Sequence, residues 1–268
     1  MREPAALPGL HALQAGADWR CVDLLSDLHL QADLPRTAAA FHRYLQHTPA
    51  DAVLILGDLF EVWVGDDAAD AGFEAQCAQW LHEAAQRRWI GFMAGNRDFL
   101  VGPEFLARCG LHALPDPTVL AFGTQRLLLT HGDALCIDDV EYQQFRAQVR
   151  SPEWQTRFLA QPLAERRKIA AHLRQASEQK KRNEGLESYA DVDDTSARRW
   201  LEDAEAATLI HGHTHRPASH RLGADKSRHV LSDWDLDNAA SGHPQRAEVL
   251  RLTQQGMTRV DLALAAPA

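Results

Sequence analysis

Residues 52–58 have the sequence AVLILGD, in which five consecutive apolar residues lead directly into a glycine and an aspartate. A short apolar run bounded by turn-forming and polar residues is typical of a buried strand in a parallel sheet. Four further, mainly apolar runs also end in clusters of Asp, Asn or His, at 21–25, 90–94, 127–130 and 208–210. Helical patterns lie between several of the runs, at about 36–47, 70–88 and 103–109. This alternation of strands and helices predicts an α/β sheet.

Two stretches depart from the alternation. From about residue 139 to 204 the chain has helical patterns and no strand pattern, so we expect an inserted helical cap. Residues 219–263 carry short apolar segments that we expect to form extra strands closing a second sheet, around 229–231, 247–252 and 258–264. We expect residues 1–20 to be an N-terminal extension and residues 21–268 to form the main domain, which contains the cap.

The composition excludes a wholly disordered chain, a collagen-like fibre and a pure coiled coil. Of 268 residues, 45% are hydrophobic and 24% are charged, which is typical of a folded globular chain. The net charge of −9 argues against a generally basic protein, so we expect no nucleic acid partner. The four cysteines form no CxxC pair, and we expect free thiols in a reducing compartment. The sequence contains no signal-peptide pattern and no apolar run near the roughly 18 residues of a spanning helix, so we expect a cytoplasmic protein, either soluble or resting on a membrane surface.

The candidate metal-binding residues follow the ends of the predicted strands. Ligands of α/β sheets bind beyond the carboxyl ends of the strands. Seven side chains with nitrogen or oxygen donors follow the five strands, namely Asp27, His29, Asp58, Asn96, His131, His213 and His215. Seven donors exceed the four that a tetrahedral zinc ion takes, and they suit two cations of higher coordination number. Oxygen donors beside imidazoles favour Mn²⁺ or Fe²⁺, and a pair of cations requires a bridging carboxylate, for which Asp58 is the natural candidate.

One histidine is ambiguous. His211 and His213 have the same i, i+2 spacing as His213 and His215. The Gly-His-x-His pattern selects the second pair, and we expect His211 to be a structural histidine at the strand end. Each motif alone is weak evidence, because Gly-Asp and Asp-x-His are also common in turns.

The order D-x-H, G-D, G-N-[HR]-[DE], H and G-H-x-H resembles the calcineurin-type metallophosphoesterases. Longer stretches are similar to the family of UDP-2,3-diacylglucosamine diphosphatases of lipid A synthesis: SDLHL (26–30), GDLFEVWVGDD (57–67), GNRDFL (95–100), HGD (131–133) with Asp138-Asp139, and HGHTHRP (211–217). The resemblance extends from about Cys21 to about Leu250. Arg97 is the most discriminating residue, because general phosphatases usually carry His at that position.

The resemblance implies a four-layer α/β-β/α sandwich with an inserted helical cap and two Mn²⁺ per chain. One metal would be held by Asp27, His29, Asp58 and His215, and the other by Asp58, Asn96, His131 and His213. The family hydrolyses the pyrophosphate of UDP-2,3-diacylglucosamine by attack of metal-activated water on the α-phosphorus, which yields UMP and 2,3-diacylglucosamine 1-phosphate. The catalytic residues implied are Asp58, Asn96, Arg97 and His213. For Arg97, a surface ion pair is the alternative to a bidentate phosphate contact.

The implied substrate contacts are Asn96, Arg97, Asp139, Ser177, Lys181 and His213. They carry over unevenly, because the family tends to have Asn where this chain has Lys181 and Lys near Glu184. Lys181 is a candidate to replace the missing cation. The differences from the family pattern at Lys181 and Glu184 affect the expected substrate contacts but not the metal ligands.

The predicted cap is basic. Residues 146–182 contain ten Lys or Arg and three Asp or Glu, a balance of +7, so the rest of the chain is −16. Apolar residues lie among these charges, namely Phe145, Val149, Trp154, Phe158, Leu159, Ile169 and Leu173. The pattern fits either a solvated helix face above an ordinary core or a cap that covers acyl chains and meets anionic lipid head groups. From the second interpretation we expect peripheral binding to the cytoplasmic face of the inner membrane.

Three hypotheses follow for the function. The first is hydrolysis of the acylated UDP-sugar at an anionic membrane surface, with no obligate protein partner. The second is another dinuclear-metal phosphoesterase that acts on a nucleotide or nucleotide-sugar. The third is a phosphoesterase fold used as a binding scaffold, which would predict lost ligands, whereas all seven are present.

Overall fold

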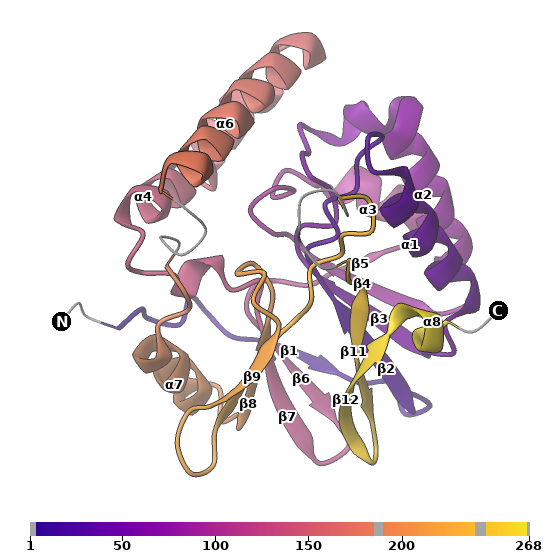
Figure 1. The fold of residues 1–268 in the computed structure, drawn as a ribbon, viewed down its shortest axis with the longest axis vertical. Helices are drawn as coiled ribbons and strands as arrows, with labels where there is room; N and C mark the ends of the chain where they lie inside the picture. The colour runs from indigo at the N-terminus through magenta and orange to yellow at the C-terminus, as the bar shows by residue number, and fades with distance from the viewer. Residues whose placement is uncertain (1–3, 185–189, 239–244, 267–268) are drawn as a thin grey trace.

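The computed structural model describes residues 4–184, 190–238 and 245–266, and the side chains of α6 are described through residue 175 and at 179 (Figure 1). One six-stranded sheet has the order β12-β11-β2-β3-β4-β5. Its strands are β12 (Gly256–Asp261), β11 (Glu248–Thr253), β2 (Cys21–Leu25), β3 (Ala52–Leu56), β4 (Trp89–Met93) and β5 (His112–Ala113). Strands β2 to β5 are parallel, and the hairpin β11-β12 joins antiparallel at β2.

The second sheet also has six strands, in the order β1-β6-β7-β8-β10-β9. They are β1 (His11–Gln14), β6 (Thr118–Phe122), β7 (Gln125–Leu129), β8 (Thr208–His211), β10 (Ser227–Val230) and β9 (Ala218–Arg221). Strands β7 and β8 run parallel, as do β8 and β10. The strands predicted from the apolar runs are confirmed, with small shifts at their ends.

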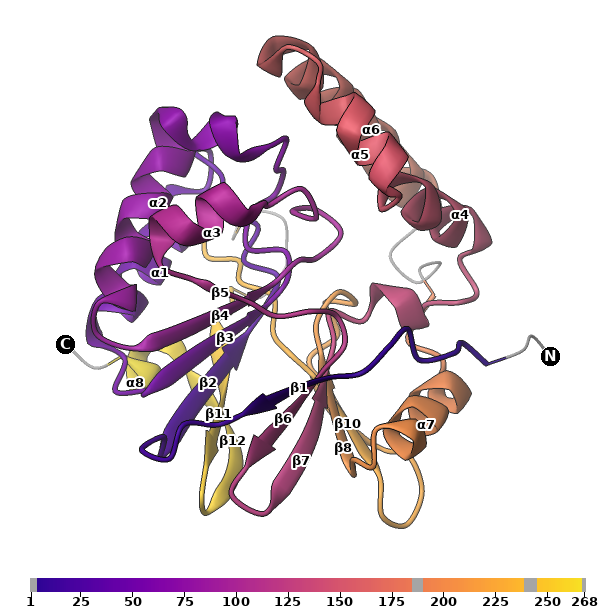
Figure 2. The ribbon, with the colours of Figure 1, turned by 180° about the vertical axis from the view of Figure 1, so that it is seen from behind.

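The two sheets face each other across a shared apolar core. This core joins Leu54 and Met93 of the first sheet to Leu129 and Ile210 of the second. Three helices cover the outer face of the first sheet: α1 (Pro35–His47), α2 (Gly72–Ala85) and α3 (Pro103–Cys109). Helix α7 (Asp194–Asp203) covers the outer face of the second. Figure 2 shows these layers from behind, and the predicted four-layer α/β-β/α sandwich is confirmed.

The strands after residue 219 differ from the expectation that they close one second sheet. Strands β9 and β10 do join β8, but β11 and β12 extend the first sheet at β2. An apolar run indicates a strand without indicating its neighbour, because the neighbour depends on which sheet edge is free when the hairpin docks. Four strands were not predicted, because β1 is an exposed edge strand, β5 has two residues, β6 lies in a hairpin without a polar cluster at its end and β9 is a short, mainly polar edge strand.

The helical insertion has two parts that behave differently. Helices α4 (Val140–Val149), α5 (Pro152–Leu159) and α6 (Leu163–Glu184) project from the sandwich, and we call them the cap (Figures 1 and 2). Helix α7 falls within the predicted range of about 139–204 but packs on the second sheet, where Trp200 and Leu201 share a core with Leu209. Its amphipathic face buries positions 196, 197, 200 and 201, which is why it docks on the sandwich.

Residues 11–14, within the predicted N-terminal extension, form an edge strand of the second sheet. Strand β1 pairs in parallel with β6. The indole Nε1 of Trp200 donates a hydrogen bond to the carbonyl oxygen of Ala5, and Ser196 accepts one from the Ala5 amide. The segment predicted as an extension therefore provides an edge strand and a contact with α7.

Two further expectations can be compared with the described residues. All four cysteines are free thiols, as predicted. Among the described residues, no helix combines the length and the apolar character needed to cross a membrane.

Candidate metal centre and substrate pocket

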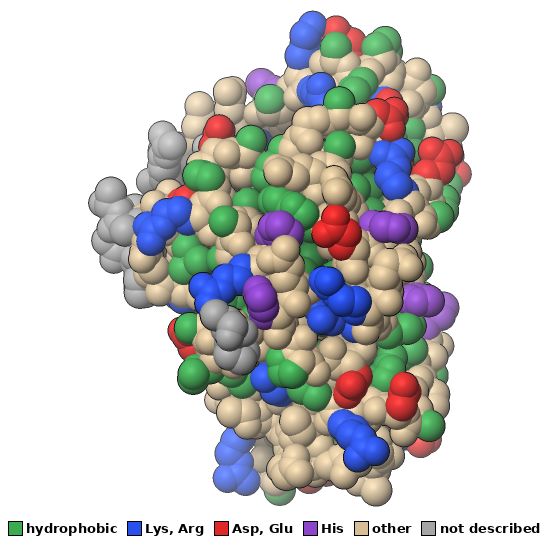
Figure 3. Space-filling model, turned by 90° about the vertical axis from the view of Figure 1, so that its right-hand side faces the viewer, with side chains coloured by type: hydrophobic (Ala, Val, Ile, Leu, Met, Phe, Trp, Pro, Cys, Tyr) green, Lys and Arg blue, Asp and Glu red, His purple; other side chains and the backbone are tan. Residues whose placement is uncertain are grey.

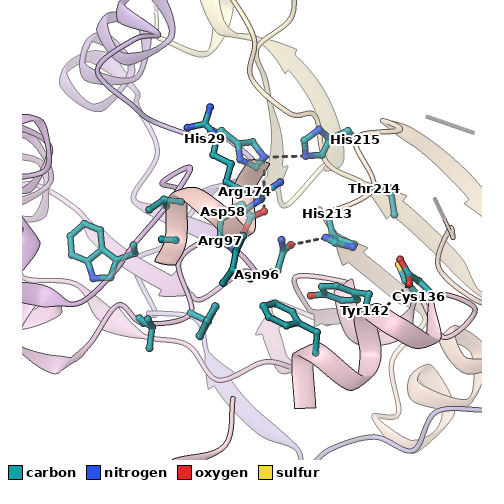
Figure 4. A pocket seen from close by; sticks show the side chains of 18 of the residues that line it. His29, Asp58, Asn96, Arg97, Cys136, Tyr142, Arg174, His213, Thr214 and His215 are labelled. Atoms are coloured by element: carbon teal, nitrogen blue, oxygen red, sulfur yellow. Dashed lines mark hydrogen bonds and ion pairs between the residues drawn. The ribbon is translucent and has the colours of Figure 1, made fainter. Parts of the chain in front are cut away.

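The seven predicted ligand side chains converge at one edge of the sandwich, where strands of both sheets end. Figure 4 shows five of them, namely His29, Asp58, Asn96, His213 and His215. On one side of the cluster, Nε2 of His29 lies 3.1 Å from Nε2 of His215. The same atom of His215 lies 3.4 Å from Oδ1 of Asp27, which is fully buried. Donor atoms of these three residues are close enough together to share one cation.

On the other side of the cluster, an amide oxygen lies between two imidazoles. Oδ1 of Asn96 is 2.9 Å from Nε2 of His131 and 2.8 Å from Nδ1 of His213. Asp58 lies between the two groups, with Oδ2 3.9 Å from Nε2 of His29 and Oδ1 3.7 Å from Nε2 of His131. The position of Asp58 suits a carboxylate that bridges two cations.

The backbone at the cluster is strained. Among the described residues, six that are not glycine have a positive φ between 49° and 67°, and five of them are predicted ligands. These are Asp27, His29, Asp58, His213 and His215. The left-handed conformation costs roughly 1–2 kcal/mol for a residue with a Cβ, and such strain concentrates at functional sites. The turns therefore place these side chains at a cost that the surrounding structure must offset.

Glycines make the close approach of these turns possible. A Cβ at Gly95 would overlap the amide nitrogen and the carboxylate of Asp58. A Cβ at Gly212 would overlap the carboxylate of Asp27 and the side chain of Ser26. The glycines of the Gly-Asn and Gly-His motifs are needed because another motif residue fills the space where their side chain would lie.

Asp98 fixes two of the turns. Its buried carboxylate accepts hydrogen bonds from the amides of Gly95 (2.7 Å) and Leu59 (2.7 Å), and longer ones from Asp58 and Phe60 (3.3 Å each). The last residue of Gly-Asn-Arg-Asp is thus a structural anchor for the turn that carries Asp58. The sequence motif contained this residue, but its spacing gave no indication of the role.

Three of the four histidines of the cluster have a partner on the nitrogen that faces away from it. Nδ1 of His29 lies 2.8 Å from Oε2 of Glu61, and Nδ1 of His215 lies 3.7 Å from Oδ2 of Asp233. Nδ1 of His131 bonds the carbonyl oxygen of Leu56 at 2.9 Å. An acceptor at Nδ1 favours the tautomer whose Nε2 lone pair is available to a cation. Glu61 and Asp233 were not predicted from the sequence, although Glu61 stands three positions after Asp58.

The charges at the cluster favour a bound cation. Burial lowers the pKa of His131, but the carboxylates of Asp58, Asp133 and Asp27 outweigh that effect and raise the pKa to about 9. Burial, together with the charge of His131, lowers the pKa of His213 to about 3, so its imidazole is neutral. A cluster that raises the proton affinity of one imidazole also attracts a metal cation. The donor set of carboxylates, an amide oxygen and imidazoles therefore fits divalent ions such as Mn²⁺.

His211 does not join the cluster. Its Nδ1 bonds the carbonyl oxygen of Gly212 at 2.8 Å, and its Nε2 lies 3.4 Å from the buried guanidinium of Arg228. Burial lowers the pKa of His211 to about 4, so the ring is neutral. These contacts agree with the expectation of a structural histidine.

Beside the cluster lies a pocket of about 470 Å³ that extends beneath the cap. Arg97, Asn96, His213 and Asp139 line it, and all four are predicted substrate contacts. Ser177 and Lys181 fall on α6 at positions whose side chains lie outside the described residues. The guanidinium of Arg97 pairs with Glu61 at 3.7 Å, whereas neighbouring Asp98 bonds backbone amides instead.

The outer part of the pocket is apolar. Its lining includes side chains from the loops after β3 and β4 and from the cap helices, among them Trp63, Phe99, Phe145, Trp154, Phe158 and Leu173. Trp154 stacks on Phe158 with ring centroids 4.7 Å apart. The pocket thus has a polar end at the cluster and an apolar end between the sandwich and the cap.

A buried carboxylate anchors the first cap helix beside the cluster. Asp133, fully buried, accepts hydrogen bonds from the hydroxyl of Tyr142 (2.6 Å) and from Nε of Arg146 (2.8 Å). Arg150 lies 3.4 Å from the same carboxylate and also bonds the carbonyl oxygen of Gly95. This role of Asp133 was not predicted from the sequence, because its partners lie nine to seventeen residues further along the chain.

Comparison with known proteins agrees with this geometry. The family model of the calcineurin-like phosphoesterases matches residues 22–217. The UDP-2,3-diacylglucosamine hydrolase of Chromobacterium violaceum is 48% identical over 215 residues, which cover 80% of this chain and 90% of that relative. The protein of the same name from Bordetella parapertussis is 42% identical over 246 residues, or 89% of this chain and 94% of the relative.

A third relative has similar coverage. The UDP-2,3-diacylglucosamine hydrolase of Aromatoleum aromaticum is 44% identical over 219 residues, which cover 80% of this chain and 89% of the relative. Identity at this level over most of both chains, together with the converging side chains, leads to one conclusion. The chain belongs to the UDP-2,3-diacylglucosamine hydrolase family of calcineurin-like phosphoesterases.

Proposed function

We propose that the chain hydrolyses the pyrophosphate of UDP-2,3-diacylglucosamine at the α-phosphorus, releasing UMP and 2,3-diacylglucosamine 1-phosphate, with two Mn²⁺ held by the seven clustered side chains. One observation carries the proposal: a single pocket joins this cluster to an apolar chamber beneath the cap. The substrate has the same division, with a charged nucleotide at one end and two acyl chains at the other.

The metal ligands fall into two sets that share Asp58. Asp27, His29 and His215 form one set, and Asn96, His131 and His213 form the other. When bound, the two cations supply positive charge that activates a water molecule and stabilises the phosphoryl oxygens. The donor set combines carboxylate and amide oxygens with imidazoles and contains no thiolate, which supports Mn²⁺ over metals that prefer thiolates.

The polar side chains of the pocket bind and orient the pyrophosphate. The planar fork of the Arg97 guanidinium can donate two hydrogen bonds to phosphate oxygens. Asn96 and His213 form the wall next to the cluster, and Asp139 lines the pocket at the start of α4. We extend the set of substrate contacts to Ser177 and Lys181 on the basis of the family resemblance.

The apolar end of the pocket binds the acyl chains and excludes water from the reacting bond. Aromatic side chains from the sandwich and the cap face each other there, with Phe99 6.2 Å from Trp154. Burial of acyl carbons contributes about 0.8 kcal/mol for each CH₂ group. A substrate without acyl chains therefore loses most of the binding energy.

The cap supports peripheral binding at the cytoplasmic face of the inner membrane, although it offers less free charge than the sequence suggests. Four of the ten basic residues counted there, Arg146, Arg150, Arg166 and Arg174, form ion pairs with carboxylates of the sandwich. Acidic and basic side chains intermingle on the face that carries α1, α2 and α8 (Figure 3). The cap, with exposed Arg167 and Lys168, is thus the better candidate for contact with anionic lipids.

The test is release of UMP from UDP-2,3-diacylglucosamine by the purified chain with Mn²⁺, compared with release from non-acylated UDP-glucosamine. We expect rapid release from the acylated substrate alone. Leu173→Gln, in the apolar chamber, should raise KM for the acylated substrate about tenfold. Leu264→Gln, at a side chain that is 72% exposed, is the matched control and should leave KM unchanged. Hydrolysis of simple phosphoesters without release of UMP would instead indicate another dinuclear-metal phosphoesterase.

A further inference from the structure

Glu61 connects the predicted metal centre to the cap. It lies on the loop after β3, with its side chain 13% exposed. One carboxylate oxygen, Oε2, is 2.8 Å from Nδ1 of His29. The other, Oε1, is 3.3 Å from Nε of Arg174 and 3.7 Å from Nη1 of Arg97. A single carboxylate thus contacts a cluster histidine, a pocket arginine and an arginine of the long cap helix α6.

The contact between Glu61 and His29 determines the tautomer and the orientation of the imidazole ring. Nε2 of His29 faces the cluster, where it lies 4.0 Å from Asp27 and 3.9 Å from Asp58. With the proton on Nδ1, which faces the Glu61 carboxylate, the lone pair is on Nε2 and points toward the cation position. Partners of this kind fix both the tautomer and the ring orientation of a metal-binding histidine.

The contact with Arg174 adds the cap to this arrangement. Arg174 also donates from Nη1 to Oε1 of Gln31 at 3.2 Å, two residues after His29. The guanidinium therefore lies between the loop that carries Glu61 and the loop that carries His29. Among the described residues, Arg97 and Arg174 are the two arginines that pair with the Glu61 carboxylate, and movement of α6 away from the sandwich would remove Arg174.

We propose that Glu61 is a positioning residue that orients His29 for cation binding, and that Arg174 couples the position of the cap to this orientation. The proposal rests on the proposed function, because it assumes that His29 binds a metal. It predicts that cation affinity depends on a side chain of the cap that is not itself one of the seven ligands.

The same loop provides a matched control. Six positions after Glu61, Asp67 forms an ion pair with Arg166, which also belongs to α6 and also donates to the carbonyl oxygen of Val64. This pair ties the same helix to the same loop, but Asp67 contacts none of the seven clustered side chains. Asp67→Asn therefore weakens the attachment of the cap without disturbing a partner of His29.

The experiment is calorimetric titration of Mn²⁺ into metal-free protein, for the parent chain, Glu61→Gln, Asp67→Asn and Arg174→Met. Glu61→Gln keeps the size of the side chain but removes its charge, and we expect affinity at one of two sites to fall about 10- to 100-fold. Asp67→Asn should stay within about twofold of the parent. Arg174→Met should lower affinity at the same site about three- to tenfold, the magnitude of a modest coupling.

Unchanged affinity in Glu61→Gln, or an equal loss in Asp67→Asn, would overturn the positioning role, and unchanged affinity in Arg174→Met would overturn the coupling to the cap. Thermal unfolding of each metal-free variant checks the fold. If Glu61→Gln does not fold, Glu61→Asp replaces it, and its shorter carboxylate should give a smaller loss at the same site, whereas no loss overturns the proposal. The titration uses no nucleotide, so a parent chain that binds two Mn²⁺ but releases no UMP contradicts the proposed function alone.

Discussion

Asp58 and Asp98 each fix the turn on which the other stands. The Asp58 carboxylate accepts a hydrogen bond from the amide of Arg97 at 2.8 Å, and the Asp98 carboxylate accepts one from the amide of Asp58 at 3.3 Å. The two turns follow adjacent parallel strands, β3 and β4. Because the pairing is reciprocal, a change in either carboxylate displaces both turns, and with them the Asp58 carboxylate and the arginine of the pocket.

Asp98→Asn should destabilise the protein and reduce its activity. An amide cannot accept hydrogen bonds at both ends, so buried N–H groups that now donate to Asp98 would lose their partners. We expect the free energy of unfolding to fall by about 1–3 kcal/mol, measured by urea denaturation. Asp70→Asn, at a carboxylate that is 67% exposed, is the control and should change stability by less than about 0.5 kcal/mol. Equal effects of the two substitutions would contradict this role of Asp98.

Gly95→Ala should abolish most activity, because the new Cβ would overlap the carboxylate of Asp58. Displacement of a reacting group by about 1 Å can cost about 100-fold in rate, and we expect a loss of that size in kcat/KM. Gly123→Ala is the control, at a glycine with φ of 59° and open space around it. The control should lose about 1 kcal/mol of stability through strain but keep its activity. A fully active Gly95→Ala enzyme would show that the turn can relax around a methyl group.

Arg97→Gln separates a phosphate contact from a surface ion pair. If the guanidinium stabilises the pyrophosphate, kcat/KM should fall about 100-fold while the metal content stays unchanged. Arg108→Gln is the matched control. It changes an arginine of α3 whose ion pair is with the exposed Asp70, and the variant should keep its activity. A small change in rate with Arg97→Gln would mean that the pair with Glu61 is the main role of Arg97.

Asp237 should make stability dependent on pH. Its carboxylate accepts hydrogen bonds from the amides of Arg36 (3.0 Å) and Thr37 (2.8 Å), so it caps α1, whose own N-cap position provides no side-chain cap. Although burial opposes the effect, these hydrogen bonds lower the pKa of Asp237 from its usual value of 3.8.

A lowered pKa in the folded state stabilises the protein above the unfolded pKa, and this contribution disappears as the pH falls. Asp237→Asn should therefore cost about 1 kcal/mol at pH 7, and the difference from the parent should shrink below about pH 4. Urea denaturation at pH 7, 5 and 3.5 measures the difference in the free energy of unfolding between the variant and the parent. A difference that is constant across these pH values would contradict the capping role of the charged carboxylate.

The strands that carry the cluster could be predicted from the sequence, because each combines a buried apolar run with a polar end. Helix α7 was assigned to the cap because local periodicity indicates an amphipathic helix without indicating which surface covers it. Trp200 reaches a core built from residues far away in the chain, including Val119. Strand β1 was missed for a related reason, since its pairing with β6 depends on a sheet edge more than one hundred residues away.

The side chains nearest the proposed cations could be predicted from the sequence. The residues that position those side chains could not. Asp27 and His29 have a spacing that suits shared coordination, and this signal is local. Glu61, Asp133 and Asp233 act through histidines or arginines on other elements, so no local spacing marks them. Their common feature is a carboxylate within a few residues of a ligand or at a strand end, which is too frequent to indicate function alone.

The most direct test is anomalous diffraction at the manganese edge from crystals grown with Mn²⁺. The account predicts two peaks per chain, one bordered by Asp27, His29 and His215 and the other by Asn96, His131 and His213, with Asp58 between them. Peaks absent from this cluster, or a single peak in a chain that hydrolyses its substrate at full rate, would contradict it.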